Sequence, residues 1–456
     1  MKTSIVKFST IMLLLATTFP AISTAQDSKT WVWASNIRGT NKNYPYSLYT
    51  DKNGNNYVAG SFSDTLIVGK TRLISKGSFD IYLLKYDDAG NLIWAKQAGG
   101  TDSDEAYGIA LDGQGNIFMT GYFSGTAGFS GKTLTSSGDR DFFIAKYLPS
   151  GDLDWVKQGG GIQEDYGTAV ATDGSGNVFI TGIFRGTMTV GNTAYISKGD
   201  KDIFVIKYDS QGQIVWSATG GGNLADESTS IITDKSGNCY VAGDFEGLAK
   251  FGKSIVISAG KKDIFLAKYN SNGEIQWLKR EGSATGDDHA SALAADNSGN
   301  IYMTGYFSGL ANFGQIELKN VGSEDIFLLK ITSDGNEIWA KQTGGKGNER
   351  GHSLILNAAG DIYVCGEFNA DFTFGQNNIK NLGDWDIFVI KYDKAGEMLG
   401  GTQLSGIGFD RAYGIGLDNS ANIYLTGFFS KAINVGSTIL KSIDADDGFI
   451  AKLKGL

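Results

Sequence analysis

The chain has 456 residues, a formal net charge of −9 at pH 7, two histidines, two cysteines and three prolines. Because nucleic-acid-binding proteins carry basic patches, this acidic balance argues against a nucleic-acid partner. After the first 25 residues, no stretch approaches the roughly 20 apolar residues that a membrane-spanning helix needs, so we expect no membrane span.

The N-terminus has the pattern of a secretory signal peptide. Lys2 and Lys7 flank the start of the apolar run IMLLLATTF, and small residues precede a cleavage site after Ala25. The pattern predicts a signal peptide over residues 1–25 and a single exported domain over residues 26–456. We therefore expect the mature chain to be extracellular, at the cell surface or in the periplasm.

One sequence unit occurs seven times, at intervals of 61 or 62 residues. A glycine follows the leading position by nine residues in every copy, and a phenylalanine follows that glycine by two. A fixed period of this size predicts a repeat architecture. The leading position is taken by Asp51, Asp112, Asp173, Asp234, Asp296, Asn357 and Asp418.

Each unit contains four strand signals separated by turn residues, such as YGIALD, NIFMTGYF, DFFIAKY and DLDWVKQ in the second copy. No window has the apolar period of a helix. Radially repeated sheets are typical of propellers, so we predict an all-β, seven-bladed β-propeller with four-stranded antiparallel blades. The first strands are expected near residues 45, 106, 167, 228, 290, 351 and 412.

The two ends of the repeat array complement each other. The last copy stops after its third strand, whereas Trp33 precedes Asp51 by the same interval that separates Trp94 from Asp112. We therefore expect residues 30–37 to supply the outer strand of blade seven, which closes the ring and makes one complete domain. Outer-strand tryptophans mark the other blades except the sixth, where Gly400 predicts the weakest outer packing.

Two charged positions recur in every copy and open and nearly close the third strand. We predict structural roles for both, with the lysine paired to the aspartate of the first turn within its own blade. The aspartates are Asp80, Asp141, Asp202, Asp263, Asp325, Asp386 and Asp447. The lysines are Lys85, Lys146, Lys207, Lys268, Lys330, Lys391 and Lys452.

These units resemble the SBBP repeats of bacterial β-propeller proteins. The resemblance is carried by DGSGNVFITGIF…DIFVIKYDSQGQIVW and DNSGNIYMTGYF…DIFLLKITSDGNEIW, and it extends over residues 30–456. It implies an exported, surface-associated propeller, and it brings no catalytic residues to this chain.

Cys239 and Cys365 lie two repeats apart. Around a ring this separation exceeds the roughly 4.4–6.8 Å between Cα atoms that a disulfide requires, so we predict two buried free thiols.

Two acidic patterns suggest cation sites, and each has a structural alternative. The D-x-x-G-N turn resembles a calcium loop, but phenylalanine stands where an EF-hand needs its twelfth-position carboxylate, which favours a plain turn. A second acid lies eight residues before each leading position and is expected to ring one mouth of the channel. It would either attract a cation or basic partner or hold loop N–H groups. These residues are Asp104, Asp165, Asp226, Asp288, Glu349 and Asp410, with Asn43 in the first copy.

Departures from the repeat indicate a binding site at that same mouth. Five residues before the leading position, the aromatic side chains His352, Tyr413, Tyr46 and Tyr107 occupy four consecutive blades. The other three copies have Thr168, Thr229 and Ser291. Such a half-aromatic wall would bind a sugar or peptide, or else pack between blades. His289, Asp288, Glu349 and Arg350 complete the candidate site.

Enzyme signatures such as G-x-S-x-G and H-E-x-x-H are missing, and two histidines at different repeat positions make a poor zinc site. We therefore predict a monomeric, non-enzymatic binding or scaffold module, without a cofactor, for a protein, peptide or glycan. Two alternatives stay open: a hydrolase or lyase that uses His289 and His352, and a structural component of a cell-surface assembly.

Overall fold

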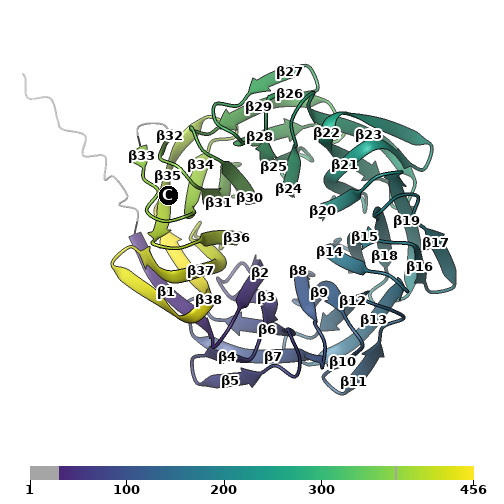
Figure 1. Cartoon of the computed structure of the whole chain (residues 1–456), viewed down its shortest axis with the longest axis horizontal. Coiled ribbons are helices and arrows are strands. Elements are labelled where there is room, and N and C mark those ends of the chain that lie inside the picture. The colour runs from purple at the N-terminus through teal and green to yellow at the C-terminus, as the bar shows by residue number, and fades with distance from the viewer. Residues whose placement is uncertain (1–29, 375–376) are drawn as a thin grey trace, which may run out of the picture.

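The computed structural model describes residues 30–374 and 377–456, so the predicted signal peptide lies outside the described residues. Every regular element in these ranges is a β-strand, and they contain no helix with the length and apolarity to cross a membrane. The sheets are arranged around a common centre (Figure 1), which makes the protein a β-propeller.

Each repeat contributes successive antiparallel strands, counted here from the centre outward. The innermost are β2 (Asn43–Thr50), β8 (Glu105–Leu111), β14 (Asp165–Thr172), β20 (Asp226–Thr233), β24 (His289–Ala295), β30 (Glu349–Leu356) and β36 (Asp410–Leu417). The second are β3 (Asn56–Phe62), β9 (Ile117–Phe123), β15 (Val178–Phe184), β21 (Cys239–Phe251), β25 (Ile301–Phe307), β31 (Ile362–Phe368) and β37 (Ile423–Val435). The third are β6 (Asp80–Tyr86), β12 (Asp141–Tyr147), β18 (Asp202–Tyr208), β22 (Ser254–Tyr269), β28 (Asp325–Ile331), β34 (Asp386–Tyr392) and β38 (Thr438–Lys454). The fourth are β7 (Leu92–Gly100), β13 (Leu153–Gly161), β19 (Ile214–Gly222), β23 (Ile275–Ser283), β29 (Glu337–Thr343) and β35 (Met398–Gly406).

The first strand of the chain lies beside the last. β1 (Thr30–Gly39) pairs antiparallel with β38, from Thr30 opposite Lys454 to Ile37 opposite Gly448, as the purple and yellow strands in Figure 1 show. Close to the centre, the rings of Tyr46 on β2 and Tyr413 on β36 are 5.3 Å apart. The first and last repeats are therefore neighbours at the centre as well as at the rim.

The sheets hold more strands than the four per repeat that the sequence predicts. The polar run between the second and third strands forms a hairpin, separate in five repeats and merged into β21–β22 and β37–β38 in the others. At six junctions the structure describes this hairpin pairing with the outer strand of the preceding repeat. The separate hairpins are β4 (Thr65–Val68) with β5 (Thr71–Ile74), β10 (Thr126–Phe129) with β11 (Lys132–Thr135), β16 (Thr187–Val190) with β17 (Thr193–Ile196), β26 (Leu310–Phe313) with β27 (Ile316–Lys319), and β32 (Phe372–Phe374) with β33 (Asn377–Ile379).

The core lies between neighbouring sheets. The repeated phenylalanine of the second strand is 0% exposed in all seven copies, and each such burial stabilises the fold by about 1.5–3 kcal/mol. The repeated glycine two residues earlier is required by backbone approach, because a Cβ at Gly121 would lie 1.9 Å from the Glu105 carbonyl oxygen. Cys239 and Cys365 are buried free thiols, which confirms the prediction for both.

At some junctions a lysine and a tryptophan, which we call the clasp, join the outer region of one repeat to the next repeat. The ammonium of Lys268 and the indole N–H of Trp277 both donate to the carbonyl oxygen of Ser333, at 2.9 and 3.2 Å. Ser333 belongs to the turn between the third and fourth strands of the following repeat. The same double contact joins Lys146 and Trp155 to Ser210. The repeated lysine therefore also binds a turn of the neighbouring blade.

The clasp explains Gly400, which stands where the other copies have tryptophan. The following repeat is the last, and it has no turn between a third and a fourth strand. Lys391 instead donates to the carbonyl oxygen of Leu456 at 3.1 Å, and the Leu456 side chain packs against the adjacent core. A tryptophan in place of Gly400 would find no such turn whose carbonyl oxygen could accept its indole N–H.

We predict that Trp277→Phe destabilises the protein by about 1 kcal/mol more than Trp339→Phe, because a net hydrogen bond contributes roughly that amount. Trp339 is a matched control: its ring lies 6.0 Å from that of Tyr302, as the Trp277 ring lies 5.9 Å from that of Tyr240, but among the described residues its N–H has no acceptor. Chemical denaturation of both variants measures the difference. Equal losses would show that the clasp adds nothing.

Candidate functional site

A central cavity of about 310 Å³ is lined by side chains from all seven inner strands. Each inner strand has a β-bulge, and the pairing skips the residue five places before the leading position; in β2 it skips Pro45 as well as Tyr46. A bulge re-aims a side chain that regular alternation would place elsewhere. The seven bulge residues are Tyr46, Tyr107, Thr168, Thr229, Ser291, His352 and Tyr413, and all of them line the cavity.

The aromatic side chains of the cavity are in mutual contact. The ring centroids of Tyr46 lie 5.0 Å from Tyr107 and 5.3 Å from Tyr413, and His352 lies 6.3 Å from Tyr413. The rings are tilted or edge-on to one another, so they do not form a flat stacking platform. The structure thus brings together the four predicted aromatic residues on one side and the small hydroxyl residues on the other.

In several repeats, charged contacts flank the cavity at the position seven residues before the leading one. Arg411 donates to both carboxylate oxygens of Glu367, at 2.5 and 2.8 Å, and His352 lies 3.3 Å from the same group. Glu367 is fully buried; burial alone would raise its pKa, but His352 and Arg411 hold it at about 2. Arg350 bonds to Glu324 at 2.5 Å and lies between the rings of Tyr306 and Trp385.

The two histidines do not share a carboxylate. His289 Nδ1 lies 2.5 Å from Asp244, whereas His352 faces Glu367. Burial opposes the charged imidazole of His289, but the Asp244 carboxylate outweighs it and raises the His289 pKa. Burial lowers the pKa of His352. The two histidines that a hydrolase would use as acid and base are therefore held by different carboxylates.

The carboxyls eight residues before each leading position do not line the mouth, which differs from the prediction. Asp288 is 1% exposed and Glu349 is 0% exposed. Asp288 accepts the backbone N–H groups of Ser283 and Ser308, and Glu349 accepts that of Gly345. These groups therefore hold backbone at the junctions.

Burial raises the pKa of all six of these carboxyls, to about 7 in Asp104, 8 in Asp165, 7 in Asp226, 6 in Asp288, 7 in Glu349 and 8 in Asp410. The nearby third-strand aspartate, such as Asp386 beside Asp410, adds to the shift.

The two charged sets of the third strand have different surroundings. Each aspartate, from Asp80 to Asp447, accepts the backbone N–H of the residue four places earlier. The lysines are less uniform: Lys207 and Lys330 lie 3.9 Å from Asp173 and Asp296 of their own repeats. Lys146 instead pairs with Asp154 at 3.1 Å.

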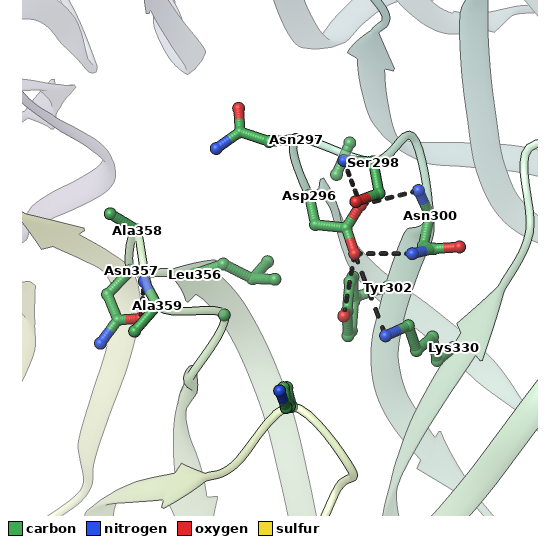
Figure 2. Close-up of a pocket in the computed structure, with 13 residues that line it drawn as sticks. Asp296, Asn297, Ser298, Asn300, Tyr302, Lys330, Leu356, Asn357, Ala358 and Ala359 are labelled. Carbon is green, nitrogen blue, oxygen red and sulfur yellow. Dashed lines mark hydrogen bonds and ion pairs between the residues drawn. The ribbon is translucent and has the colours of Figure 1, made fainter.

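The opposite face carries the D-x-x-G-N turns, where a cavity of about 470 Å³ opens between repeats five and six. Figure 2 shows Asp296 on its wall, bound by Ser298, Asn300, Tyr302 and Lys330. The donors of the turn and its neighbours already occupy both carboxylate oxygens. The turn aspartate therefore organises its own loop.

Sequence reasoning missed Glu105, Asp244, Glu367 and Arg411. Glu105 and Arg411 share the repeat position of His289 and Arg350, seven before the leading residue. Asp244 and Glu367 stand ten after it, on the second strand of the preceding repeat. The sequence signal that could have identified them is the variation of residue type between repeats at these two positions, which includes tyrosine, glutamate, histidine and arginine.

Comparison with known proteins agrees with the fold. Residues 93–122 match the family model described as Beta-propeller repeat (SBBP). An uncharacterized WD repeat-containing protein of Acanthamoeba polyphaga mimivirus is 24% identical over 537 residues, which cover 92% of this chain and 38% of that protein. The regulatory protein FlaEY of Caulobacter vibrioides is 29% identical over 188 residues, which cover 40% of this chain and 19% of that protein. The chain thus spans less than two-fifths of the length of these relatives.

Among solved structures, the Neurospora crassa Pan2 WD40 domain is similar with a TM-score of 0.48 and 8% identity, covering 93% of this chain and 96% of that one. Sqt1 from Chaetomium thermophilum is similar with a TM-score of 0.46 and 10% identity, covering 92% and 99%.

We predict that the protein loses stability as the pH rises from about 5 to 8. The buried carboxyls have folded pKa values of about 6 to 8, above the unfolded value of about 4. The folded state therefore binds more protons in this window, and raising the pH favours unfolding. The lowered pKa of His352 makes the protein more stable as the pH rises, but this is one group against the six carboxyls.

The melting temperature at pH 5.5 and 8.5 measures this slope. Asp410→Asn, which removes one of these titrating groups, should flatten it, whereas Asp139→Asn at an exposed carboxyl should not. A melting temperature that rises with pH would contradict the prediction.

Proposed function

We propose that the chain is a closed, seven-bladed β-propeller that acts as a non-enzymatic binding scaffold for a protein partner. Closure is supported by the pairing of β1 with β38 and by the contact between Tyr46 and Tyr413. Seven copies of the sequence unit and seven inner strands around one cavity support the blade count. Propellers of this kind offer a rigid face on which a partner can dock.

Export is the second part of the proposal. It rests on the signal-peptide pattern of residues 1–25 and on the resemblance to SBBP repeats, which implies exported proteins. The working compartment would be the periplasm, the cell surface or the extracellular medium. An acidic, monomeric propeller is suited to any of these.

The observation that carries the binding proposal is the asymmetry of the cavity wall. Three tyrosines and one histidine occupy consecutive bulges, and threonine or serine occupies the rest. The inner-strand pairing does not require such a difference, since the same bulge occurs whichever residue stands there. A partner that docks over one half of the mouth does need it. The tilted rings favour a protein side chain over a sugar, which stacks best on an open face.

The separate pairing of His289 and His352 gives no support to a hydrolase or lyase. Acid and base must reach the same substrate atoms, yet each imidazole is held by its own carboxylate. We therefore place the function in recognition.

The combined substitution of Tyr107, His352 and Tyr413 by alanine should abolish binding of the partner, because it removes most of the aromatic wall. The partner would be isolated on the immobilised wild-type protein from an extract of the source cells and then purified. Titration of the purified partner against both proteins measures the loss. The control is the replacement of Thr168 and Thr229 by alanine, which alters the other half and should weaken binding less than about threefold, within the range of minor contacts. Unchanged binding by the aromatic variant would place the site elsewhere.

A further inference from the structure

One acidic side chain at the mouth, Glu105, has surroundings that suit a cationic ligand. The acidic side chains that take part in contacts around the mouth include Glu105, Glu227, Asp244, Glu324, Glu367 and Asp446. Four have a basic partner within 3 Å, namely Lys201 for Glu227, His289 for Asp244, Arg350 for Glu324 and Arg411 for Glu367. Within the part of the chain that the structure describes, Glu105 and Asp446 form no ion pair. Asp446 accepts from Tyr44 at 3.0 Å, whereas Glu105 contacts Tyr107, which lines the cavity.

Neutral hydroxyl groups surround Glu105 instead. Tyr122 donates to it at 2.6 Å, Ser61 at 3.3 Å and Tyr107 at 3.5 Å. Arg140, whose guanidinium lies 4.6 Å from the centre of the Tyr122 ring, is engaged by Tyr166 and Glu164. Glu105 is only partly buried; it is not itself among the residues that line the cavity, but Tyr107, which donates to it, is.

The tyrosines beside Glu105 also border the cavity. Tyr107 and Tyr46 line it, and their rings meet at 5.0 Å. A cation over an aromatic ring gains about 0.5–2 kcal/mol, depending on how far it is desolvated. A carboxylate next to several such rings is therefore a receptor for a positive group. Burial and the charge of Glu105 raise the pKa of Tyr46 and Tyr107, so both stay neutral donors at physiological pH.

The volume of about 310 Å³ lies at the lower end of small-molecule pockets, which suits one inserted side chain. The net charge of −9 favours the approach of a basic partner over a distance.

We propose that the partner presents a lysine or arginine side chain that enters the mouth and pairs with Glu105 beside Tyr46, Tyr107 and Tyr122. This inference rests on the proposed function and deepens it by naming the group that is recognised. The ammonium or guanidinium would take the place that Lys201 and Arg411 take at Glu227 and Glu367. The partner is thus a protein with a projecting basic residue.

The test is a calorimetric titration with the acetylated, amidated peptide Gly-Ser-Lys-Ser-Gly and its arginine, norleucine and glutamate counterparts. The wild-type protein should bind the lysine and arginine peptides at least about tenfold more tightly than the norleucine peptide, which corresponds to 1.4 kcal/mol. Glu105→Gln should remove this preference. Glu227→Gln, at a carboxylate already paired with Lys201, should leave it unchanged.

A second pair of variants tests the tyrosine contribution. Tyr107→Phe keeps the ring and should retain the preference, whereas Tyr107→Leu should weaken cationic peptides several-fold, as the loss of one cation–π contact would. Melting curves check that each variant is folded.

No preference for cationic peptides in the wild type, or an undiminished preference in Glu105→Gln, would overturn the inference. Either result would leave the proposed function standing if the partner still requires Tyr107, His352 and Tyr413. Binding of the partner by that triple variant would instead overturn the proposed function.

Discussion

The structure depends on how each blade satisfies backbone groups of its neighbour. A sheet that ended at its fourth strand would leave a row of N–H and C=O groups unpaired at the rim. The following repeat covers that edge with its hairpin, and a lysine–tryptophan clasp fixes a turn of that repeat from the other face. A third set of bonds runs from buried carboxyls such as Asp104 to the amides of Gly100 and Ser124. Stability is therefore concentrated at the seams between repeats.

The buried carboxyls show that the contacts between repeats also include unfavourable electrostatic interactions. Burial disfavours the ionisation of Asp104 and raises its pKa, and the nearby Asp80 carboxylate adds to the effect. Gly99 lies between these two carboxyl groups. A larger residue is disfavoured there, because its Cβ would come within 3.0 Å of both. At the junction of the first and last repeats the arrangement changes. Asn43 takes the place of the second acid, and Gly39 donates to Asp447 at 2.7 Å.

The sequence permits the fold to be predicted because its period carries the information. Glycine and phenylalanine at fixed places in the second strand can be recognised without knowledge of contacts. The hairpin was overlooked because its strands have only three or four residues, although a turn glycine such as Gly69 or Gly191, with positive φ, marks it. The aromatic half of the cavity was predictable from repeat alignment alone. The burial of Asp288 and Glu349 was not, since a bulge three residues later shifts the alternation of the strand.

The bulge also explains how identical frames can carry different chemistry. The bulged residue has no partner on the second strand, so its replacement leaves the ladder intact. Tyrosine, threonine, serine and histidine can stand there because each blade is held by contacts elsewhere. The position seven before the leading residue behaves differently, because it must match the preceding blade. Glu105 faces Ser61, His289 faces Asp244, and Arg411 faces Glu367. The bulge position can therefore vary alone, whereas the position seven before the leading residue varies only together with its partner on the preceding blade. A binding surface built from both positions can change while the contacts between blades persist.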